Sequence, residues 1–200
     1  MTAGKFKFVK AEDTPLTERK KVLRVDMKKR RAEVCNRDVK ARLAVEQFFA
    51  AGLGDKDKYF VYISFSSELS TELLIAELIK RKKQVFCPRV EKDGMVAVAY
   101  TQDCTLSDFG VREPVGAPYL GQMDVCVCPL IAVDEQGARL GFGGGYYDKF
   151  LARQKDAALV GWCFEMQVIN AVPSEPHDIK MQYIATERGV RTIERKTEGN

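Results

Sequence analysis

The residues best suited to chemistry lie at positions 139–148, where four glycines in five positions precede two tyrosines and Asp148. Glycine permits left-handed backbone angles and leaves no side chain between the amide groups and a ligand. Successive N–H groups can then converge on an anion where a helix begins. Asp148 falls in the first turn of the expected helix, where a carboxylate could hold a metal ion bound to that anion. The pattern predicts a phosphate-binding loop with its own magnesium ligand.

Two familiar phosphate-binding motifs do not fit this loop. A Walker A loop ends in Gly-Lys-Ser/Thr, whereas this one ends in Gly-Tyr-Tyr-Asp. A dinucleotide-binding fingerprint needs a glycine three residues after Gly143, where Tyr146 stands. A tight strand-to-helix turn that binds nothing is the alternative interpretation, because glycine mostly marks turns. Arg139, the two tyrosines and Asp148 favour a site, because polar and aromatic groups on loops often carry function.

Other polar groups lie outside the loop. Lys20 and Arg24 are one helical turn apart and could neutralise phosphates, but a solvated basic face continued by residues 28–31 is the alternative. Glu68 follows a β-forming run and could bind a polar ligand, or could simply favour the dipole of the next helix. Asp178 could be a second ligand of Mg²⁺, which commonly takes one or two carboxylates plus phosphate oxygens. Without such a partner, Asp178 would be a turn or cap residue.

Composition and charge are those of one ordinary globular domain. The 200 residues are 46% hydrophobic and 30% charged, and the net charge of +4 is too small to argue for nucleic acid by itself. No apolar run approaches the roughly 20 residues of a membrane span, and residues 1–10 lack the apolar segment of a secretory signal. The six cysteines form no CxxC pair, which excludes zinc ribbons. Buried free thiols are expected, with Cys126 and Cys128 on one sheet face.

Helical and strand-like segments alternate along the chain. The expected helices are residues 15–35, 38–51, 70–81 and 146–154, and the expected strands are residues 59–65, 84–90, 95–100, 125–130, 159–164 and 184–186. This alternation predicts an α/β fold with a mostly parallel sheet, in which ligands bind at the carboxyl ends of the strands. Residues 101–123 are expected to be irregular. In the helix at 70–81, Leu73, Leu74, Leu78 and Ile79 are expected to face inward.

The expected organisation is a single domain with two polar ends. Residues 1–16 are expected to form a flexible lead-in, residues 17–191 the α/β domain, and residues 192–200 a charged tail.

Taken together, the motifs resemble the family of 5-formyltetrahydrofolate cyclo-ligases, also called methenyltetrahydrofolate synthetases. Residues 134–151 contain Arg-Leu-Gly-x-Gly-Gly-Gly-Tyr-Tyr-Asp-Lys-Phe-Leu and look like the signature of that family. Shorter matches follow in the family's order at residues 20–24, 64–68, 88–89, 110–114, 124–129, 161–167 and 173–186. Lys149 stands where many members have arginine.

The resemblance implies a fold and a reaction. The fold would be a three-layer α/β/α arrangement with a mostly parallel sheet, similar to the sugar-phosphate isomerase and CoA-transferase group. The reaction would be the ATP- and Mg²⁺-dependent cyclisation of 5-formyltetrahydrofolate to 5,10-methenyltetrahydrofolate, with release of ADP and phosphate. In that scheme the formyl oxygen is phosphorylated before the ring closes. Phosphoryl transfer needs positioning and charge neutralisation more than acid–base groups, which suits a chain with one histidine.

The resemblance also assigns roles on the nucleotide side by matching position. Lys20 and Arg24 would contact the phosphates of ATP. Asp148 and Asp178 would hold Mg²⁺. The residues of the ATP-binding loop would be Arg139, Gly141, Phe142, Gly143, Gly144, Gly145, Tyr146, Tyr147 and Asp148.

On the other side of the site the resemblance implies folate contacts. Glu68 would bind the pterin, whose donor edge suits a carboxylate acceptor. Phe65 and one of Tyr146 or Tyr147 would line the pocket. Arg139 and Tyr147 would be the catalytic residues.

The expected partners are ATP and 5-formyltetrahydrofolate, with no nucleic acid and no membrane. A monomer in the cytoplasm is expected, with the mitochondrion as the alternative location. A non-catalytic, RNA-binding module on the same fold is the competing function, motivated by the basic helix at 20–31. A kinase or ligase acting on another amide or pterin is a third. Retention of Arg139, the glycines and both aspartates argues against a pure RNA binder, which needs no metal-phosphate loop.

Overall fold

The computed structural model describes residues 15–107, 110–176 and 178–194. Its elements follow in the order α1 (Leu16–Ala32), α2 (Arg37–Ala50), β1 (Lys58–Val61), α3 (Glu72–Lys80), β2 (Gln84–Glu91), β3 (Gly94–Ala99), β4 (Cys104–Leu106), β5 (Arg112–Pro114), β6 (Pro118–Tyr119), β7 (Val125–Cys128), β8 (Ala132–Asp134), β9 (Arg139–Leu140), α4 (Tyr146–Leu151), β10 (Ala158–Trp162), the 3-10 helix η2 (Glu165–Gln167), β11 (Val168–Ile169), β12 (Tyr183–Thr186) and β13 (Gly189–Thr192). Most of the expected lead-in, residues 1–14, and most of the expected tail, residues 195–200, lie outside the described ranges. None of the helices in those ranges combines the length and the apolar character that a bilayer crossing requires.

Eight strands form the main sheet, in the order β13-β12-β10-β7-β1-β2-β3-β6. The five strands β12, β10, β7, β1 and β2 run parallel, while β13, β3 and β6 pair antiparallel with their neighbours. The expected α/β class with a mostly parallel sheet is therefore confirmed. The central strand β7 reads Val-Cys-Val-Cys and is buried at all four positions, as a strand covered on both faces must be.

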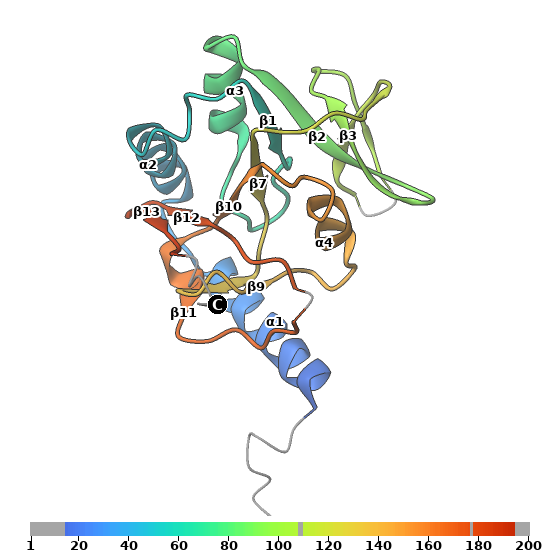
Figure 1. Ribbon diagram of the computed structural model, residues 1–200. Helices are drawn as coiled ribbons and strands as arrows, with labels where there is room; N and C mark the ends of the chain where they lie inside the picture. The colour runs from blue at the N-terminus through green and yellow to red at the C-terminus, as the bar shows by residue number, and fades with distance from the viewer. Residues whose placement is uncertain (1–14, 108–109, 177, 195–200) are drawn as a thin grey trace, which may run out of the picture.

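Helices cover both faces of the main sheet (Figure 1). On one face α2 and α3 pack into a core that includes Tyr59 of β1. On the other face α4 packs so that Phe150 stacks on Phe60 of β1, with ring centroids 4.2 Å apart. Neighbouring residues of β1 thus point into opposite layers. Cys126 and Cys128 share the second core as buried free thiols, which confirms the expectation for this pair.

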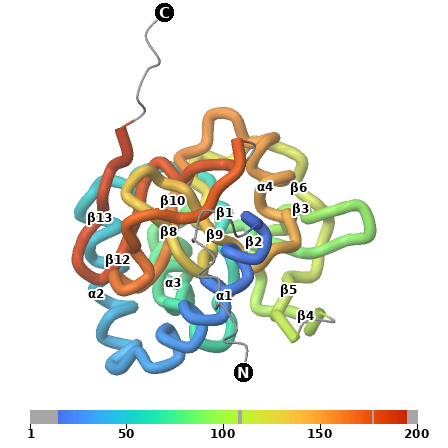
Figure 2. Tube along the Cα trace, turned by 90° about the horizontal axis from the view of Figure 1, so that it is seen from below, coloured from blue at the N-terminus to red at the C-terminus, as the bar shows by residue number. Residues whose placement is uncertain are grey.

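α1 packs beside the carboxyl end of β7 rather than in either layer. The chain that leaves β7 enters a small sheet of β11, β8 and β9. Met27 of α1 is fully buried against Ile131 and Leu140 of this region. Figure 2 shows α1 between α2 on one side and the β4–β5 hairpin on the other. A helix in this place can bring its side chains to the edge where ligands bind in parallel sheets.

Two expectations about the middle of the chain are wrong. Residues 101–123 are not irregular throughout but contain β4, β5 and β6. These strands are two or three residues long, too short for an alternation of apolar residues to be visible. In α3, Leu74 and Leu78 are buried as expected, whereas Leu73 and Ile79 are 43% and 47% exposed. The run Leu-Leu-Ile-Ala-Glu-Leu-Ile places apolar residues around much of the helix, so its spacing does not single out the buried face.

The end of the chain also differs from the expectation. β13 pairs antiparallel with β12, although no strand was expected after residue 186 and the tail was expected from residue 192. The small sheet of β8, β9 and β11 was likewise not expected. Each of these strands has two to four residues and gains its order from pairing with a neighbour, which a local pattern does not reveal.

Candidate functional site

The glycine loop connects β9 to α4. Gly143 has φ 106°, and Gly145, which precedes the first turn of α4, has φ 69°. Both are left-handed angles that residues with a side chain adopt only under strain. α4 ends at Leu151 rather than at the expected residue 154. A helix of six residues has only a short dipole, so the positive charge at this loop has to come mainly from side chains.

α1 supplies two of those cations. Arg24 donates from Nε to the Gly141 carbonyl at 2.9 Å. Lys20 donates from Nζ to the carboxylates of Glu175 and Asp178 at 2.8 and 2.9 Å, with only 12% of its side chain exposed. Burial lowers the pKa of Lys20, but hydrogen bonds and charge from the two carboxylates outweigh it and the pKa is raised. Lys20 is therefore a fixed ammonium group beside the loop.

A third cation, Arg139, lies in β9, the strand that leads into the loop. It donates from Nη2 to Asp148 Oδ1 at 2.8 Å, and its guanidinium lies 5.5 Å from the centre of the Tyr147 ring. The Arg139 side chain is 4% exposed and that of Asp148 is 34% exposed. The Nε of Arg139 is buried and has no hydrogen-bond partner within the described ranges. An unpaired buried donor costs about 1–3 kcal/mol, and in folded proteins such a group needs an explanation beyond stability.

Glu68 follows the carboxyl end of β1 in a strained turn. Ser66 has φ 55°, an angle that non-glycine residues seldom adopt. The Phe65 amide donates to Glu68 Oε2 at 2.8 Å. Burial raises the pKa of Glu68, while the hydrogen bond from Phe65 and the charge of Arg31 act against it. The Phe65 ring is 48% exposed, so a largely buried carboxylate lies beside an accessible aromatic face.

A single cleft of about 820 Å³ brings together every site residue expected from the sequence. The expected residues that line it are Lys20, Arg24, Phe65, Glu68, Arg139, residues 141–148 and Asp178. Residues that were not expected include Thr17, Lys28, Tyr62, Pro88, Val90, Met95, Glu113 and Glu175. Pro88 and Glu113 belong to the short family-like segments at 88–89 and 110–114, so a signal for them was present. Val90 and Met95 are ordinary strand residues, and the sequence holds no signal that they line the cleft.

A second cavity of about 640 Å³ lies on α3 and the chain that follows β3. It is lined by Glu72, Tyr100 and Arg112 among others, and it shares Ile63 with the first cleft. None of the expected site residues lines it. The candidate chemistry therefore belongs to the first cleft.

The charge of Glu68 acts on two tyrosines, the buried Tyr62 and the partly buried Tyr147. Burial raises the pKa of Tyr62 and of Tyr147 well above the ordinary value, and the nearby charge of Glu68 acts in the same direction. Both phenols are therefore neutral near physiological pH. Tyr147 can donate a hydrogen bond in the cleft, but it is not suited to act as a base.

The two aspartates expected to hold Mg²⁺ line the same cleft, each beside a cation. Asp148 is paired with Arg139 and Asp178 with Lys20. In the described part of the chain no group of three or more acidic, cysteine or histidine side chains forms a metal cage. Mg²⁺ in nucleotide sites is usually held by one or two carboxylates plus phosphate oxygens and water. The donor set fits a magnesium ion that arrives with a nucleotide.

The basic run of α1 is not one solvated face. Arg31 was expected to belong to such a face, but it is 4% exposed. Lys20, Arg24 and Lys28 line the cleft, whereas Arg30 faces solvent. The positions 20, 24, 28 and 31 follow helical spacing, so one stripe of α1 turns toward the site.

Comparison with known proteins gives a consistent result. The sequence model described as the 5-formyltetrahydrofolate cyclo-ligase family matches residues 16–187. A 5-formyltetrahydrofolate cyclo-ligase of Haemophilus influenzae is 31% identical over 132 residues, covering 60% of this chain and 71% of the relative. One from Escherichia coli K12 is 30% identical over 137 residues, with 63% and 75% covered. The solution structure of Aquifex aeolicus 5,10-methenyltetrahydrofolate synthetase superposes with a TM-score of 0.78 at 25% identity, covering 90% of this chain and 96% of that one.

Proposed function

The chain belongs to the 5-formyltetrahydrofolate cyclo-ligase family, and from this premise we propose that its cleft converts 5-formyltetrahydrofolate (folinic acid) and ATP to 5,10-methenyltetrahydrofolate, ADP and phosphate. The activity is that of EC 6.3.3.2. The observation that carries the proposal is the single cleft that joins a cationic glycine loop to a largely buried carboxylate. A ligase of this kind must hold both substrates in one cavity so that the γ-phosphate meets the formyl oxygen.

The nucleotide would lie over the glycine loop. Lys20 and Arg24 would face its phosphates from α1, and the Arg139 guanidinium would face them from β9. Support comes from the position of all three groups on one cleft with the loop. Each of these cations is already tied to a neighbour by a bond of 2.8 to 2.9 Å, so little side-chain entropy is lost on binding. Phe142, at the tip of the loop, is 49% exposed and lies under Lys28 at 5.1 Å.

Asp148 and Asp178 would hold a Mg²⁺ ion carried by the nucleotide. Bound there, the ion would neutralise charge on the phosphate oxygens and fix their geometry. Arg139 and Lys20 orient the two carboxylates through the ion pairs described above.

The folate would occupy the other half of the cleft. Glu68 would accept hydrogen bonds from the donor edge of the pterin, and Phe65 with Tyr146 or Tyr147 would pack against its ring. Support comes from the accessible Phe65 ring beside the largely buried carboxylate. A buried hydrogen bond to an ionised group contributes about 1.5–3 kcal/mol, so Glu68 would be the main polar anchor.

The proposed reaction has two stages, and in each of them one new bond forms as the bond to a leaving group breaks. The formyl oxygen attacks the γ-phosphorus, and the bond to the ADP oxygen breaks. The lone pair of N10 then attacks the formyl carbon, the carbon–oxygen bond to phosphate breaks, and the N10 proton passes to solvent. Lys20, Arg24 and Arg139 stabilise the charge on the phosphoryl oxygens during transfer. Tyr147, whose phenol stays protonated, acts as a hydrogen-bond donor and orients the reacting groups.

Other features of the function stay predictions. A relationship to the sugar-phosphate isomerase and CoA-transferase group, a monomeric state and a cytoplasmic location remain expectations from the family resemblance. The feature that motivated the competing RNA-binding hypothesis is divided. Lys20 and Arg24 line the cleft and Arg31 is buried, so only part of the basic run of α1 is left for a phosphate backbone.

The near-ultraviolet chromophore of the methenyl product provides the direct test. The purified chain with Mg-ATP and fresh 5-formyltetrahydrofolate is expected to form it, and ATP-dependent release of phosphate should match it mole for mole. Asp148→Ala is expected to abolish turnover while the unfolding curve stays two-state. A folded wild-type chain that forms no chromophore would contradict the proposal. Normal turnover by Asp148→Ala would remove only the metal role of that residue.

A further inference from the structure

One buried charge beside the cleft has no role in the function proposed above. Arg31, in the last turn of α1, is 4% exposed. Its Nε donates to the Ser67 hydroxyl at 3.0 Å, and its Nη1 donates to the Leu130 carbonyl at 3.4 Å. Burial lowers its pKa and the charge of Glu68 raises it, but a guanidinium stays protonated in proteins. Burying such a group is costly unless it is paired, so these contacts need an explanation.

The contacts of Arg31 join two strand ends of the cleft. Ser67 lies in the turn after β1, next to Glu68 and the strained Ser66. Leu130 lies just after the end of β7, the neighbour of β1 in the sheet. The guanidinium therefore ties α1 to the carboxyl ends of the two strands that meet at the centre of the site. A strained turn persists only where its surroundings hold it in place, and the Arg31 contact to Ser67 does so from inside the protein.

The charge of Arg31 also acts on Glu68. The groups that interact with the Glu68 carboxylate are Arg31 from α1, Tyr62 next to β1 and Tyr147 from α4. Both phenols are neutral near physiological pH, so Arg31 carries the charge of this set. Both residues are bonded to the same turn, since Arg31 donates to the Ser67 hydroxyl and the Phe65 amide donates to Glu68.

We propose that Arg31 is a positioning residue for the folate half of the cleft: through Ser67 and Leu130 it fixes the turn at 66–68 to the end of β7 and places a cation near Glu68, so that the carboxylate is held where it meets the pterin. The inference rests on the proposed function, because it assumes that Glu68 binds the substrate. Arg31 does not line the cleft and therefore acts through Glu68 rather than on the substrate. Its contact with the loop is weaker, since the guanidinium lies 5.9 Å from the Phe142 ring and Lys28 covers that ring at 5.1 Å.

A purely structural role for Arg31 can be separated with a matched control. Arg37 donates from Nη2 to the carbonyls of Arg31 and Ala32 at 2.8 and 3.0 Å, so it holds the same end of α1 without reaching the turn after β1. Arg37 is the first residue of α2, and Arg37→Met removes a guanidinium that contacts the same end of α1. If Arg31 only anchors α1, the two methionine variants should behave alike.

Equilibrium binding of 5-formyltetrahydrofolate without ATP is the primary measurement. Arg31→Met is expected to raise the Kd at least about tenfold, Arg31→Lys by less, and Arg37→Met by less than about threefold. The Kd for a non-hydrolysable ATP analogue should change by less than about threefold in all of them. Arg31→Lys keeps the charge and most of the volume, so it carries the test if Arg31→Met does not fold.

The pH profile of folate binding provides a readout that a structural role would not move. Protonation of Glu68 should weaken binding on the acid side. Removing a nearby cation raises the pKa of a carboxylate, so Arg31→Met should move this acid limb to higher pH, while Arg31→Lys should leave it close to that of the wild type. In a Glu68→Gln background the Arg31→Met loss should largely vanish, because coupled residues do not add.

The outcomes distinguish the two proposals. A wild-type chain that binds folate, with Arg31→Met unchanged or matched by Arg37→Met, would overturn the positioning role alone. Additive losses in the double variant would also overturn it. A wild-type chain that binds ATP but no folate would overturn both the proposed function and this inference.

Discussion

Two guanidinium–carboxylate pairs of this molecule differ in what surrounds them. Arg139 donates to Asp148 on the wall of the cleft, and its Nε has no hydrogen-bond partner within the described residues. Arg191 donates from both terminal nitrogens to Glu165, whose carboxylate also accepts from the Thr186 hydroxyl at 2.8 Å. The first pair leaves a donor unused next to a cavity. The second has its carboxylate bonded on both oxygens, away from the residues described as lining the cleft.

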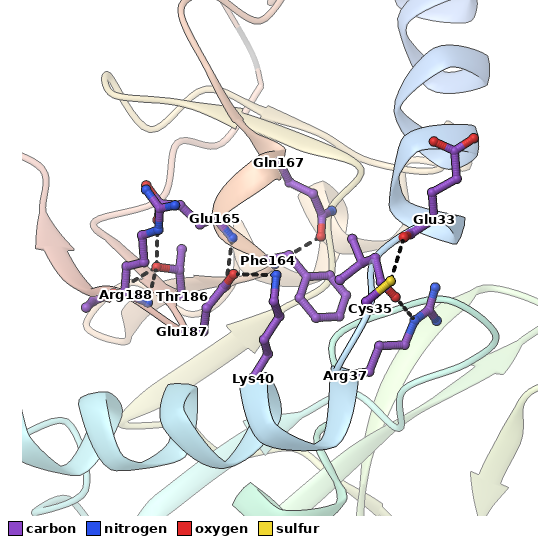
Figure 3. Close-up of polar contacts among 12 residues, drawn as sticks. Glu33, Cys35, Arg37, Lys40, Phe164, Glu165, Gln167, Thr186, Glu187 and Arg188 are labelled. Atoms are coloured by element: carbon purple, nitrogen blue, oxygen red, sulfur yellow. Dashed lines mark hydrogen bonds and ion pairs between the residues drawn. The ribbon is translucent and has the colours of Figure 1, made fainter.

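The surroundings of Glu165 form a closed polar cluster (Figure 3). The Glu165 amide donates to Glu187 at 2.8 Å, and Glu187 pairs with Lys40 of α2 at 3.2 Å. These bonds join η2, the β12–β13 hairpin and α2, and none of the residues that make them lines the cleft. An ion pair by itself therefore says little about function. A pair that keeps an unpaired hydrogen-bond donor beside a cavity can use it to bind a ligand, at some cost in stability. A pair whose hydrogen bonds are all made within the protein serves to hold structural elements together.

The largest effect is expected at the open pair. Arg139→Met should lower kcat/KM about a thousandfold, because an arginine that stabilises transferring phosphoryl oxygens contributes on the order of 10³ or more. Its free energy of unfolding should fall little or even rise, since an unpaired buried donor disappears with the side chain. Single-turnover kinetics and urea unfolding measure the two quantities. If Arg139→Met loses much stability but keeps its turnover, Arg139 has only a structural role, as is expected of Arg191.

A smaller effect is expected at Glu68, confined to one substrate. Glu68→Gln keeps the shape but loses the charge, so the KM for 5-formyltetrahydrofolate should rise about 10- to 100-fold, which corresponds to roughly 1.5–3 kcal/mol. The KM for ATP should stay within about threefold. Steady-state kinetics with each substrate varied in turn gives both constants. An equal rise in both KM values would mean that Glu68 shapes the whole cleft rather than the folate half.

Lys20 should show the reverse pattern at a lower magnitude. Lys20→Met removes one of three cations that face the proposed phosphates, so the KM for ATP should rise about tenfold while the KM for the folate stays nearly constant. Lys20→Arg should recover part of the loss, because it restores the charge beside Glu175 and Asp178. The same two-substrate kinetics checks it. A folate-selective defect would reverse the assignment of the two halves of the cleft.

The half of the cleft that we propose for the nucleotide could be predicted from local sequence, whereas much of the half that we propose for the folate could not. The glycines, Arg139 and Asp148 lie within ten residues, so their contact follows from one loop between a strand and a helix. The folate half is assembled from the turn after β1, from β2 and β3, and from the β4–β5 hairpin. Val90 and Met95 enter the cleft only because β2 and β3 pair with each other. That pairing is a tertiary event, which no local pattern encodes.

Tertiary contacts that no local pattern encodes also explain why the buried position of Arg31 in α1 was not predicted. The class of the fold and the mostly parallel sheet could be anticipated from buried runs such as that of β7, because a strand covered on both faces must be apolar throughout. Arg31 was assigned to solvent because charged residues usually face it. Its helical spacing from Lys20 and Arg24 was a usable signal, but spacing alone does not show that a strand end lies within reach of the guanidinium.

The smallest effect on turnover is expected at the closed pair, where stability should change instead. The hydrogen bonds of Arg191 lower the pKa of Glu165 below its ordinary value of 4.5, with burial acting in the opposite direction. A carboxyl group whose pKa is lowered by folding stabilises the protein above its unfolded pKa, and this contribution is lost as the pH falls through the folded pKa. Arg191→Met should therefore cost about 1 kcal/mol at neutral pH, a modest value because 39% of the Arg191 side chain is exposed and solvent screens the pair.

The cost of Arg191→Met should then shrink in acid, as Glu165 becomes protonated in the wild type as well. Urea unfolding of both proteins at neutral and at acidic pH measures this difference, and the methenyl chromophore assay measures turnover. Arg188→Met is a suitable control, because Arg188 lies in the same hairpin and bonds to Thr186 through its backbone amide, which the substitution keeps. A difference in stability that stays constant with pH would mean that Arg191 acts through packing of its side chain. A loss of turnover would mean that the Arg191–Glu165 pair also shapes the cleft. The contrast with the Arg139–Asp148 pair would then no longer hold, because neither pair would be purely structural.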